Sequence, residues 1–265
     1  MISHWTILCC ICTLFLSMVL PIGALIFLCR KYPIQRLGRA WLLGAVGFFI
    51  PQMVIRTPLL QLFYGSEWFL DFSQNHSVLF VLFLAFTAAA FELSGRYAAG
   101  RTLREPLPFS KALATGMGHG ACESIVLVGI TYINNLVIIF LINSGNLPTD
   151  GAAGAQLEAL KTTLLQTPAW LFLAAGVERL LTMVCHAAFS VLVCYGLHRR
   201  RVLPCCLLCL GLHTLLDTFA GIPTLFPSLS QYAGYGLVYL LLALFALACL
   251  WLLFRLRRQW NGPVY

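Results

Sequence analysis

Charged residues are scarce in this chain. Only 10% of its 265 residues are Asp, Glu, Lys or Arg, whereas 60% are hydrophobic. A soluble domain carries charge on about a quarter of its residues, so this composition excludes a water-exposed globular surface. The alternation of apolar and polar residues that is typical of membrane β-barrel strands is absent as well, which excludes that class. The remaining class is a protein of membrane-spanning helices.

Acidic residues are fewer than basic ones, with 9 Asp and Glu against 17 Lys and Arg and a formal net charge of +8. In a soluble protein this excess would suggest nucleic-acid binding. Here the basic residues stand in short clusters between apolar runs, and no basic face with interleaved aromatic residues is present. The pattern is typical of cytoplasmic loops that face anionic lipid, so we expect contact with the bilayer and no nucleic-acid partner.

Two cysteine pairs at the spacing of a zinc finger are also lacking, although the chain has 11 cysteines. All of them lie within or beside apolar segments, where cysteine packs as a small hydrophobic residue. Cys206 and Cys209 form a CxxC, but it has no second pair at zinc-finger spacing. We therefore expect free thiols.

Long apolar runs dominate what is present, and each is long enough to cross the hydrocarbon core of a bilayer as a helix. They cover residues 4–29, 38–63, 76–99, 109–142, 167–197, 202–222 and 230–254. Pro51 and Pro58 predict a kink or a broken end in the second run. The fourth run is too long for a perpendicular crossing, so it is expected to tilt or to extend beyond the bilayer.

The predicted fold is all-α, a polytopic bundle of about seven transmembrane helices that forms one integral membrane domain over residues 1–265. No basic residue precedes the first run, which favours a retained span over a cleaved signal peptide. Residues 144–167 are expected to form the one sizeable loop outside the membrane. Trp68, Trp170 and Trp260 are expected to be anchors at the membrane interface.

The orientation follows from the basic residues. With seven spans, 13 of the 17 Lys and Arg fall on one side. They are Arg30, Lys31, Arg36, Arg39, Arg101, Arg104, Lys111, Arg199, Arg200, Arg201, Arg255, Arg257 and Arg258. The positive-inside rule then places the N-terminus outside and the C-terminus in the cytoplasm of a multi-pass protein of the cell membrane.

Ionisable side chains inside the apolar runs are the strongest functional signal, because they are costly in a bilayer. They are Glu92 and Arg96 in the third run, His119 and Glu123 in the fourth, Glu178, Arg179 and His186 in the fifth, and His213 and Asp217 in the sixth. At the rise of an α-helix, a Glu or His of each of these runs lies roughly 12 to 20 Å from the basic end of its helix. Four helices are therefore expected to bring Glu and His to a similar depth.

Spacing sharpens this expectation. Three pairs stand four residues apart and so share a helix face: Glu92 with Arg96, His119 with Glu123, and His213 with Asp217. Glycines at 116, 118 and 120 surround His119 and would allow a neighbouring backbone to approach closely. Glu178 and Arg179 lie nearer the outer face and are expected to form a structural ion pair, and His186 alone fits a helix–helix hydrogen bond as well as a metal site.

Two mechanisms suit this set of residues. In the first, His119, His186 and His213 bind a zinc-like ion and Glu92 or Glu123 deprotonates its water. In the second, a Glu activates water without a metal while His side chains supply acid catalysis and an oxyanion donor. Either would hydrolyse a bond delivered inside the membrane.

The same residues resemble the YhfC family of bacterial intramembrane proteases. The resemblance rests on residues 91–97 (FELSGRY), 116–123 (GMGHGACE), 178–186 and 213–217 (HTLLD) in this order and spacing, and it covers most of the chain. The family is grouped with the CAAX-processing and PrsW-type membrane proteases. Those proteins often have two adjacent acids in the first motif, whereas Leu93 follows Glu92 here.

The resemblance implies a membrane-embedded peptidase, of metallo or glutamic type, with Zn²⁺ as the expected cofactor. Glu92 would activate water and Arg96 would orient it. The other groups would be metal ligands or acid and oxyanion groups (His119, Glu123, His186, His213), with Asp217 as a partner of His213. The expected substrate is a membrane protein or a lipidated peptide. Two alternatives stay open: a proton- or ion-coupled transporter that uses the same residues as a relay, and a polar cluster that only locks helices together.

Overall fold

The computed structural model describes the chain except for residues 33–35, 104–106, 149, 227 and 262–265, so Arg104 of the predicted basic clusters lies outside the described residues. Within the described residues every regular element is helical. Seven helices there are long and apolar enough to span a membrane: His4–Lys31, Leu37–Phe63, Ser77–Leu103, Phe109–Ser144, Ala169–His198, Val202–Ala220 and Tyr232–Gln259. Each overlaps one predicted run, and the all-α, multi-pass fold is confirmed. The direction in which the helices cross stays a prediction.

The helices group into two compact units, one made of residues 1–24 and 123–180 and the other of residues 25–122 and 181–265. The first, fourth and fifth membrane helices belong partly to each unit, because their residues continue past the boundaries at 24, 122 and 180. The single domain predicted from the sequence stays a prediction, and the two units are described separately.

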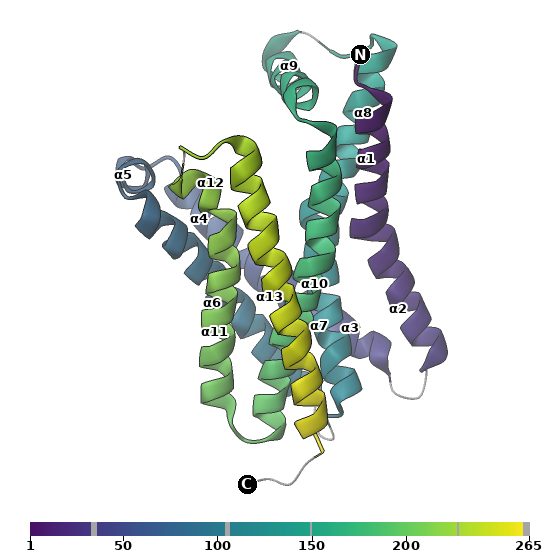
Figure 1. The fold of residues 1–265 in the computed structure, drawn as a ribbon, viewed down its shortest axis with the longest axis vertical. Helices are drawn as coiled ribbons and strands as arrows, with labels where there is room; N and C mark the ends of the chain where they lie inside the picture. The colour runs from purple at the N-terminus through teal and green to yellow at the C-terminus, as the bar shows by residue number, and fades with distance from the viewer. Residues whose placement is uncertain (33–35, 104–106, 149, 227, 262–265) are drawn as a thin grey trace. The chain divides into compact units, whose positions relative to one another are not determined.

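The first unit contains α1 (His4–Leu14), the π-helical segments Phe15–Val19 and Ser124–Gly129, α8 (Ile130–Ser144), α9 (Gly151–Gln166) and the beginning of α10 (Ala169–His198). In Figure 1, α1 and α8 lie side by side. The hydroxyls of Thr13 and Tyr132 both donate to the carbonyl oxygen of Phe172, at 2.5 and 3.0 Å, which ties α1 and α8 to α10.

The segment predicted as a loop after α8 contains a helix, α9, so this part of the prediction is wrong. Leu157, Leu160 and Leu164 stand three and four residues apart and pack against the core of the first unit. Because one apolar stripe suffices to dock a helix, packing orders this segment although its glycines disfavour helix.

The second unit contains the remaining elements. They are most of α2 (Leu20–Lys31), α3 (Leu37–Phe48), the π-helical segment Phe49–Arg56, α4 (Thr57–Phe63), α5 (Glu67–Asn75), α6 (Ser77–Leu103), α7 (Phe109–Glu123) without its last residue, the rest of α10, α11 (Val202–Ala220), α12 (Ile222–Leu225) and α13 (Gln231–Gln259). In Figure 1, α11 lies between α6 and α13, and it packs against both. α6 also packs against α3.

Proline widens the second membrane helix where a kink or break was predicted. Pro51 lies in the π-helical segment, and Pro58 lies in the first turn of α4. Proline lacks the N–H of a regular helix turn, and the π-helical segment carries the chain past Pro51 as one continuous helix.

Glycine allows the backbones around His119 to meet, as the sequence predicts. A Cβ atom on Gly118 would lie 1.9 Å from the carbonyl oxygen of Trp41 in α3, and one on Gly116 would lie 2.6 Å from the Cα of Ala187 in α10. Both distances are far shorter than any real carbon contact, so α7 can hold these positions only without side chains.

Trp260 differs from the prediction of an interfacial anchor. Its side chain is buried, its Nε1 donates to the carbonyl oxygen of Leu107 at 3.0 Å, and its ring stacks on His198. This tryptophan closes the end of α13 against the rest of the second unit. Trp68 and Trp170 are exposed, in keeping with an interfacial position.

Candidate active site

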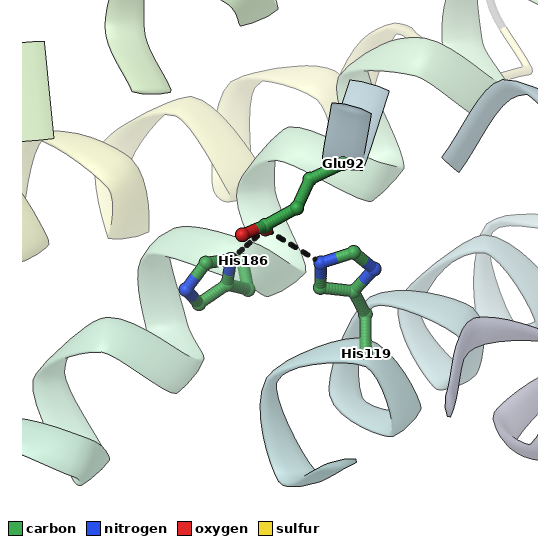
Figure 2. Close-up of side chains that lie close together, drawn as sticks. All are labelled: Glu92, His119 and His186. Carbon is green, nitrogen blue, oxygen red and sulfur yellow. Dashed lines mark hydrogen bonds and ion pairs between the residues drawn. The ribbon is translucent and has the colours of Figure 1, made fainter. Parts of the chain in front are cut away.

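Glu92 of α6 lies at the centre of a buried polar cluster in the second unit. Its Oε2 accepts hydrogen bonds from Nε2 of His119 at 2.9 Å and from Nη2 of Arg96 at 3.1 Å. Nε2 of His213 and Nδ1 of His186 lie 3.6 and 3.8 Å from the same oxygen. Figure 2 shows Glu92 with His119 and His186 on either side of the carboxylate. No side chain of the five is more than 5% exposed.

Each of four helices contributes to this cluster: α6 supplies Glu92 and Arg96, α7 supplies His119, α10 supplies His186 and α11 supplies His213. The structure thus brings together the Glu and three His that the sequence places at a similar depth. The glycines of α7 explain how the helices come close enough, because α10 approaches α7 directly beside His119.

Arg96 determines which ring nitrogen accepts a hydrogen bond in two of the histidines. Its Nη2 lies 2.6 Å from Nδ1 of His186, and its Nη1 lies 3.2 Å from Nδ1 of His213. A guanidinium group can only donate, so both Nδ1 atoms accept and each ring carries its proton on Nε2. The Nε2–H of His213 then faces Glu92 and also Oδ1 of Asp217, which is 3.5 Å away.

Aromatic rings enclose the cluster. Phe48 meets the ring of His119 edge-on at a centroid distance of 5.4 Å, and Phe189 packs on His213 at 5.2 Å. The guanidinium of Arg96 lies over the face of Phe189, 5.7 Å from its centre. In such surroundings charges interact much more strongly than in water, so Glu92 and Arg96 stabilise each other.

Three of these groups could hold a metal ion. An oxygen of Glu92 and one ring nitrogen each of His119 and His186 all lie within 4.8 Å of one another. Two imidazole nitrogens and a carboxylate oxygen are a donor set that zinc accepts in catalytic sites, so the residues fit such an ion. The structure puts Glu92 in this group, where the sequence analysis put His213. Arg96 donates to Nδ1 of His186, so an ion bound at that nitrogen would have to displace this hydrogen bond.

Glu123 belongs to another cluster, in the first unit. Nη1 of Arg179 donates to Oε1 of Glu123 at 2.9 Å, and Arg179 also pairs with Glu178. The predicted Glu178–Arg179 ion pair is therefore present, and Glu123 is its third member. Although His119 and Glu123 share α7, their partners lie in different units.

Arg56 is a buried charged residue that the sequence analysis missed. Its guanidinium donates to the carbonyl oxygen of Leu84 at 2.7 Å and to the hydroxyl of Thr87 at 3.2 and 3.1 Å, both on α6. A signal was available, because an arginine inside an apolar run is as unusual as the acids that were singled out. It connects the π-helical segment Phe49–Arg56 to the first half of the helix that carries Glu92.

A buried carboxylate, an arginine and three histidines from four membrane helices define the chain as a polytopic membrane protein with a candidate water-activating centre. A family model described as YhfC intramembrane metalloprotease matches residues 16–237, and the chain belongs to this family. A curated relative, "Uncharacterized membrane protein YhfC" of Bacillus subtilis (strain 168), is 27% identical over 192 residues, which cover 71% of this chain and 74% of that protein. No solved structure matches. The predicted resemblance to the YhfC family is confirmed.

Proposed function

We propose that this protein is an intramembrane endopeptidase in which Glu92 activates water to hydrolyse a peptide bond of a membrane-embedded or membrane-adjacent substrate. One observation carries the proposal: a single carboxylate oxygen, buried in the membrane-spanning bundle, is approached by three imidazoles and a guanidinium. Such a group is costly in a bilayer, and it offers a base, acids and hydrogen-bond donors within reach of one another. The description of the matching family supports the same activity.

The proposed reaction starts with a water molecule beside Glu92. The carboxylate takes a proton from the water, and the resulting hydroxide oxygen attacks the carbonyl carbon of the substrate. When the carbon–nitrogen bond breaks, the proton held on Glu92 passes to the leaving amine. The products are a carboxyl group and an amine, so one water is consumed and no other reactant is needed.

The other residues of the cluster have supporting roles in this proposal. The Nε2–H of His119 holds the carboxylate of Glu92, and the Nε2–H of His213 is a donor for the negative oxygen that forms during attack. Arg96 donates to Nδ1 of His186 and of His213 and so orients both rings, and Asp217 lies 3.5 Å from Nε2 of His213. A metal ion, held by Glu92, His119 and His186, would act as a Lewis acid on water or on the substrate carbonyl.

A defined assay tests the activity. The purified protein is reconstituted in vesicles with a library of single-span peptides, and new termini are identified by mass spectrometry. Glu92→Gln should lower cleavage at least roughly 100-fold, because general-base catalysis contributes about 10²- to 10⁴-fold. Glu158→Gln is the matched control, since Glu158 is an exposed acid paired with Lys161 on α9.

Cleavage by the wild type and Glu158→Gln but not by Glu92→Gln supports the proposal. Equal cleavage by Glu92→Gln and the control, or no cleavage by any of them, contradicts it. Proton flux without cleavage would instead favour the carrier that the sequence left open. Metal content measured on the same preparations tests the ion: zinc bound by the wild type should be lost in His119→Ala.

A further inference from the structure

A cavity of about 340 Å³ lies beside the polar cluster in the second unit. One wall is formed by Phe80, Leu84 and Ala85 of α6. Another consists of Asp217 of α11, Gly221 at the C-terminal end of α11, and Thr224 of α12. Its volume is at the lower end of the range for ligand sites, which fits one side chain of a bound molecule better than a large folded ligand.

Asp217 connects this cavity to the candidate active site. Its side chain is 30% exposed and lines the cavity, and its Oδ1 lies 3.5 Å from Nε2 of His213. The same Nε2 lies 3.6 Å from Oε2 of Glu92. A molecule in the cavity would therefore be one histidine away from the carboxylate that is proposed to activate water.

The walls indicate which chemistry the cavity accepts. Phe80, Leu84 and Ala85 present hydrocarbon, so an apolar group is favoured there. Asp217 and Thr224 are the polar side chains among the lining residues, and such groups can bond to backbone N–H or C=O groups of a bound chain. An extended peptide has this combination, with an apolar side chain flanked by polar backbone.

The α6 wall of the cavity is held in place by contacts with the π-helical segment Phe49–Arg56 and with α5. Arg56 donates to the carbonyl oxygen of Leu84, and Phe80 packs edge-on against Phe69 and Phe72 of α5. A wall that is fixed by a buried hydrogen bond and by aromatic contacts can distinguish side chains by size.

We propose that this cavity binds the apolar side chain of a peptide substrate next to the bond that is cleaved, and that it selects substrates by the size of that side chain. This inference rests on the proposed peptidase function. Ala85 is the position where the size limit is tested most directly, because its methyl group lines the cavity on α6 and a larger side chain there would reduce the volume.

Photo-crosslinking tests binding without cleavage. The Glu92→Gln protein in vesicles receives a single-span peptide that carries photo-leucine at central positions, and crosslinked residues are mapped by mass spectrometry. We expect crosslinks in residues 80–85 and 217–224. Ala85→Leu in the Glu92→Gln background should reduce them several-fold, whereas Ala98→Leu, at an exposed position of the same helix, should not.

Cleavage specificity gives a second readout in the protein with Glu92 intact. Ala85→Leu should shift the preferred cleavage sites to smaller side chains, and Leu84→Ala should shift them to larger ones. Ala98→Leu should leave the preference as in the wild type. Unchanged preferences in both cavity variants would overturn the proposal.

The remaining outcomes separate this inference from the proposed function. Crosslinks only outside the two segments, with cleavage by the wild type, would overturn the cavity and leave the peptidase intact. Crosslinks within the two segments without any cleavage would overturn the peptidase function, and with it the cleavage specificity proposed here, and would leave only a peptide-binding cavity. A phospholipid with a diazirine in its acyl chain is the competing probe. If it labels the same segments and the peptide does not displace it, the cavity is a lipid site and the proposal is overturned.

Discussion

Glu92 and Arg96 form a neutral pair at the centre of three imidazoles. The guanidinium donates to Glu92, His186 and His213, so one side chain supplies both the opposite charge and the hydrogen bonds of the cluster. A divalent ion held by Glu92, His119 and His186 would supply positive charge to the same groups. At the scale of single residues, Arg96 and an ion are therefore partly interchangeable, and this can be measured.

Arg96→Gln should destabilise the metal-free protein and increase its response to zinc. Loss of a buried ion-pair partner costs about 3–5 kcal/mol, which corresponds to a fall on the order of 10 °C in the thermal unfolding midpoint. Added Zn²⁺ should then raise the midpoint more in Arg96→Gln than in the wild type, because the ion replaces the missing charge. Thermal unfolding in detergent, with and without Zn²⁺, measures both effects.

Arg56→Gln is the control for this prediction. Arg56 is also a buried arginine of the second unit, but its hydrogen bonds go to Leu84 and Thr87. The Arg56→Gln substitution should lower the thermal unfolding midpoint, and the rise in this midpoint on adding Zn²⁺ should be the same as in the wild type. A zinc response that is equal in the two variants would show that Arg96 does not share its position with a metal ion.

At the scale of helices, glycine contacts position three of the four helices that form the polar cluster, α6, α7 and α10. Gly118 faces the backbone of Trp41 in α3, and Gly116 faces Ala187 in α10. A Cβ atom on Gly95 of α6 would lie 1.7 Å from the carbonyl oxygen of Gly47 in α3. These contacts lie within a turn of His119 and Arg96, so the packing that joins the helices also sets the rotation of each one toward the cluster.

Gly118→Ala should therefore destabilise the second unit. The added methyl group would collide with a backbone oxygen that cannot move alone, and α3 would have to shift away from α7. We expect a loss of about 1–3 kcal/mol or more, as for overpacked cores. Gly211→Ala is the matched control, because nothing lies within 4 Å of its added Cβ in α11. That change should be neutral or stabilising by up to about 1 kcal/mol. Equal unfolding midpoints for the two variants would contradict the packing argument.

At the scale of the whole molecule, the exposed apolar side chains indicate that the protein lies in a membrane. Large apolar side chains on the spanning helices are exposed, among them Trp5, Phe140, Leu203 and Trp251. In water such surfaces would associate, whereas a bilayer covers them. α10 differs from the other spanning helices, because 67% of its most apolar stretch is buried inside the protein. It carries both His186 and Arg179, and so contributes to the polar clusters of both units.

The orientation in the bilayer is a testable property of the whole chain. We expect the N-terminus outside and the C-terminus in the cytoplasm, because the basic clusters then face the cytoplasm. A fluorescent protein fused after the last helix should fluoresce, and alkaline phosphatase fused there should be inactive. Phosphatase inserted in the segment between α8 and α9 should be active. The opposite pattern at both positions would reverse the predicted topology.

The sequence by itself determined the class, the seven spans and most of the buried ionisable residues, although not Arg56. Its long apolar runs allow only helices, since a backbone in lipid must satisfy its own hydrogen bonds. The helical rise also fixes the depth of each residue, which is why Glu92, His119, His186 and His213 could be expected to meet.

Partner choice was decided only by the tertiary structure. The depth of a residue in the membrane does not determine how its helix is rotated or which neighbouring helix it faces. The rotation and the neighbours depend on contacts such as those of the glycines, which join helices far apart in the sequence. Thus Glu123 pairs with Arg179, Arg96 reaches two histidines, and Glu92 joins the group that could bind a metal. The docking of α9 and the burial of Trp260 depend on the same kind of contact, which a linear pattern of hydrophobicity does not contain.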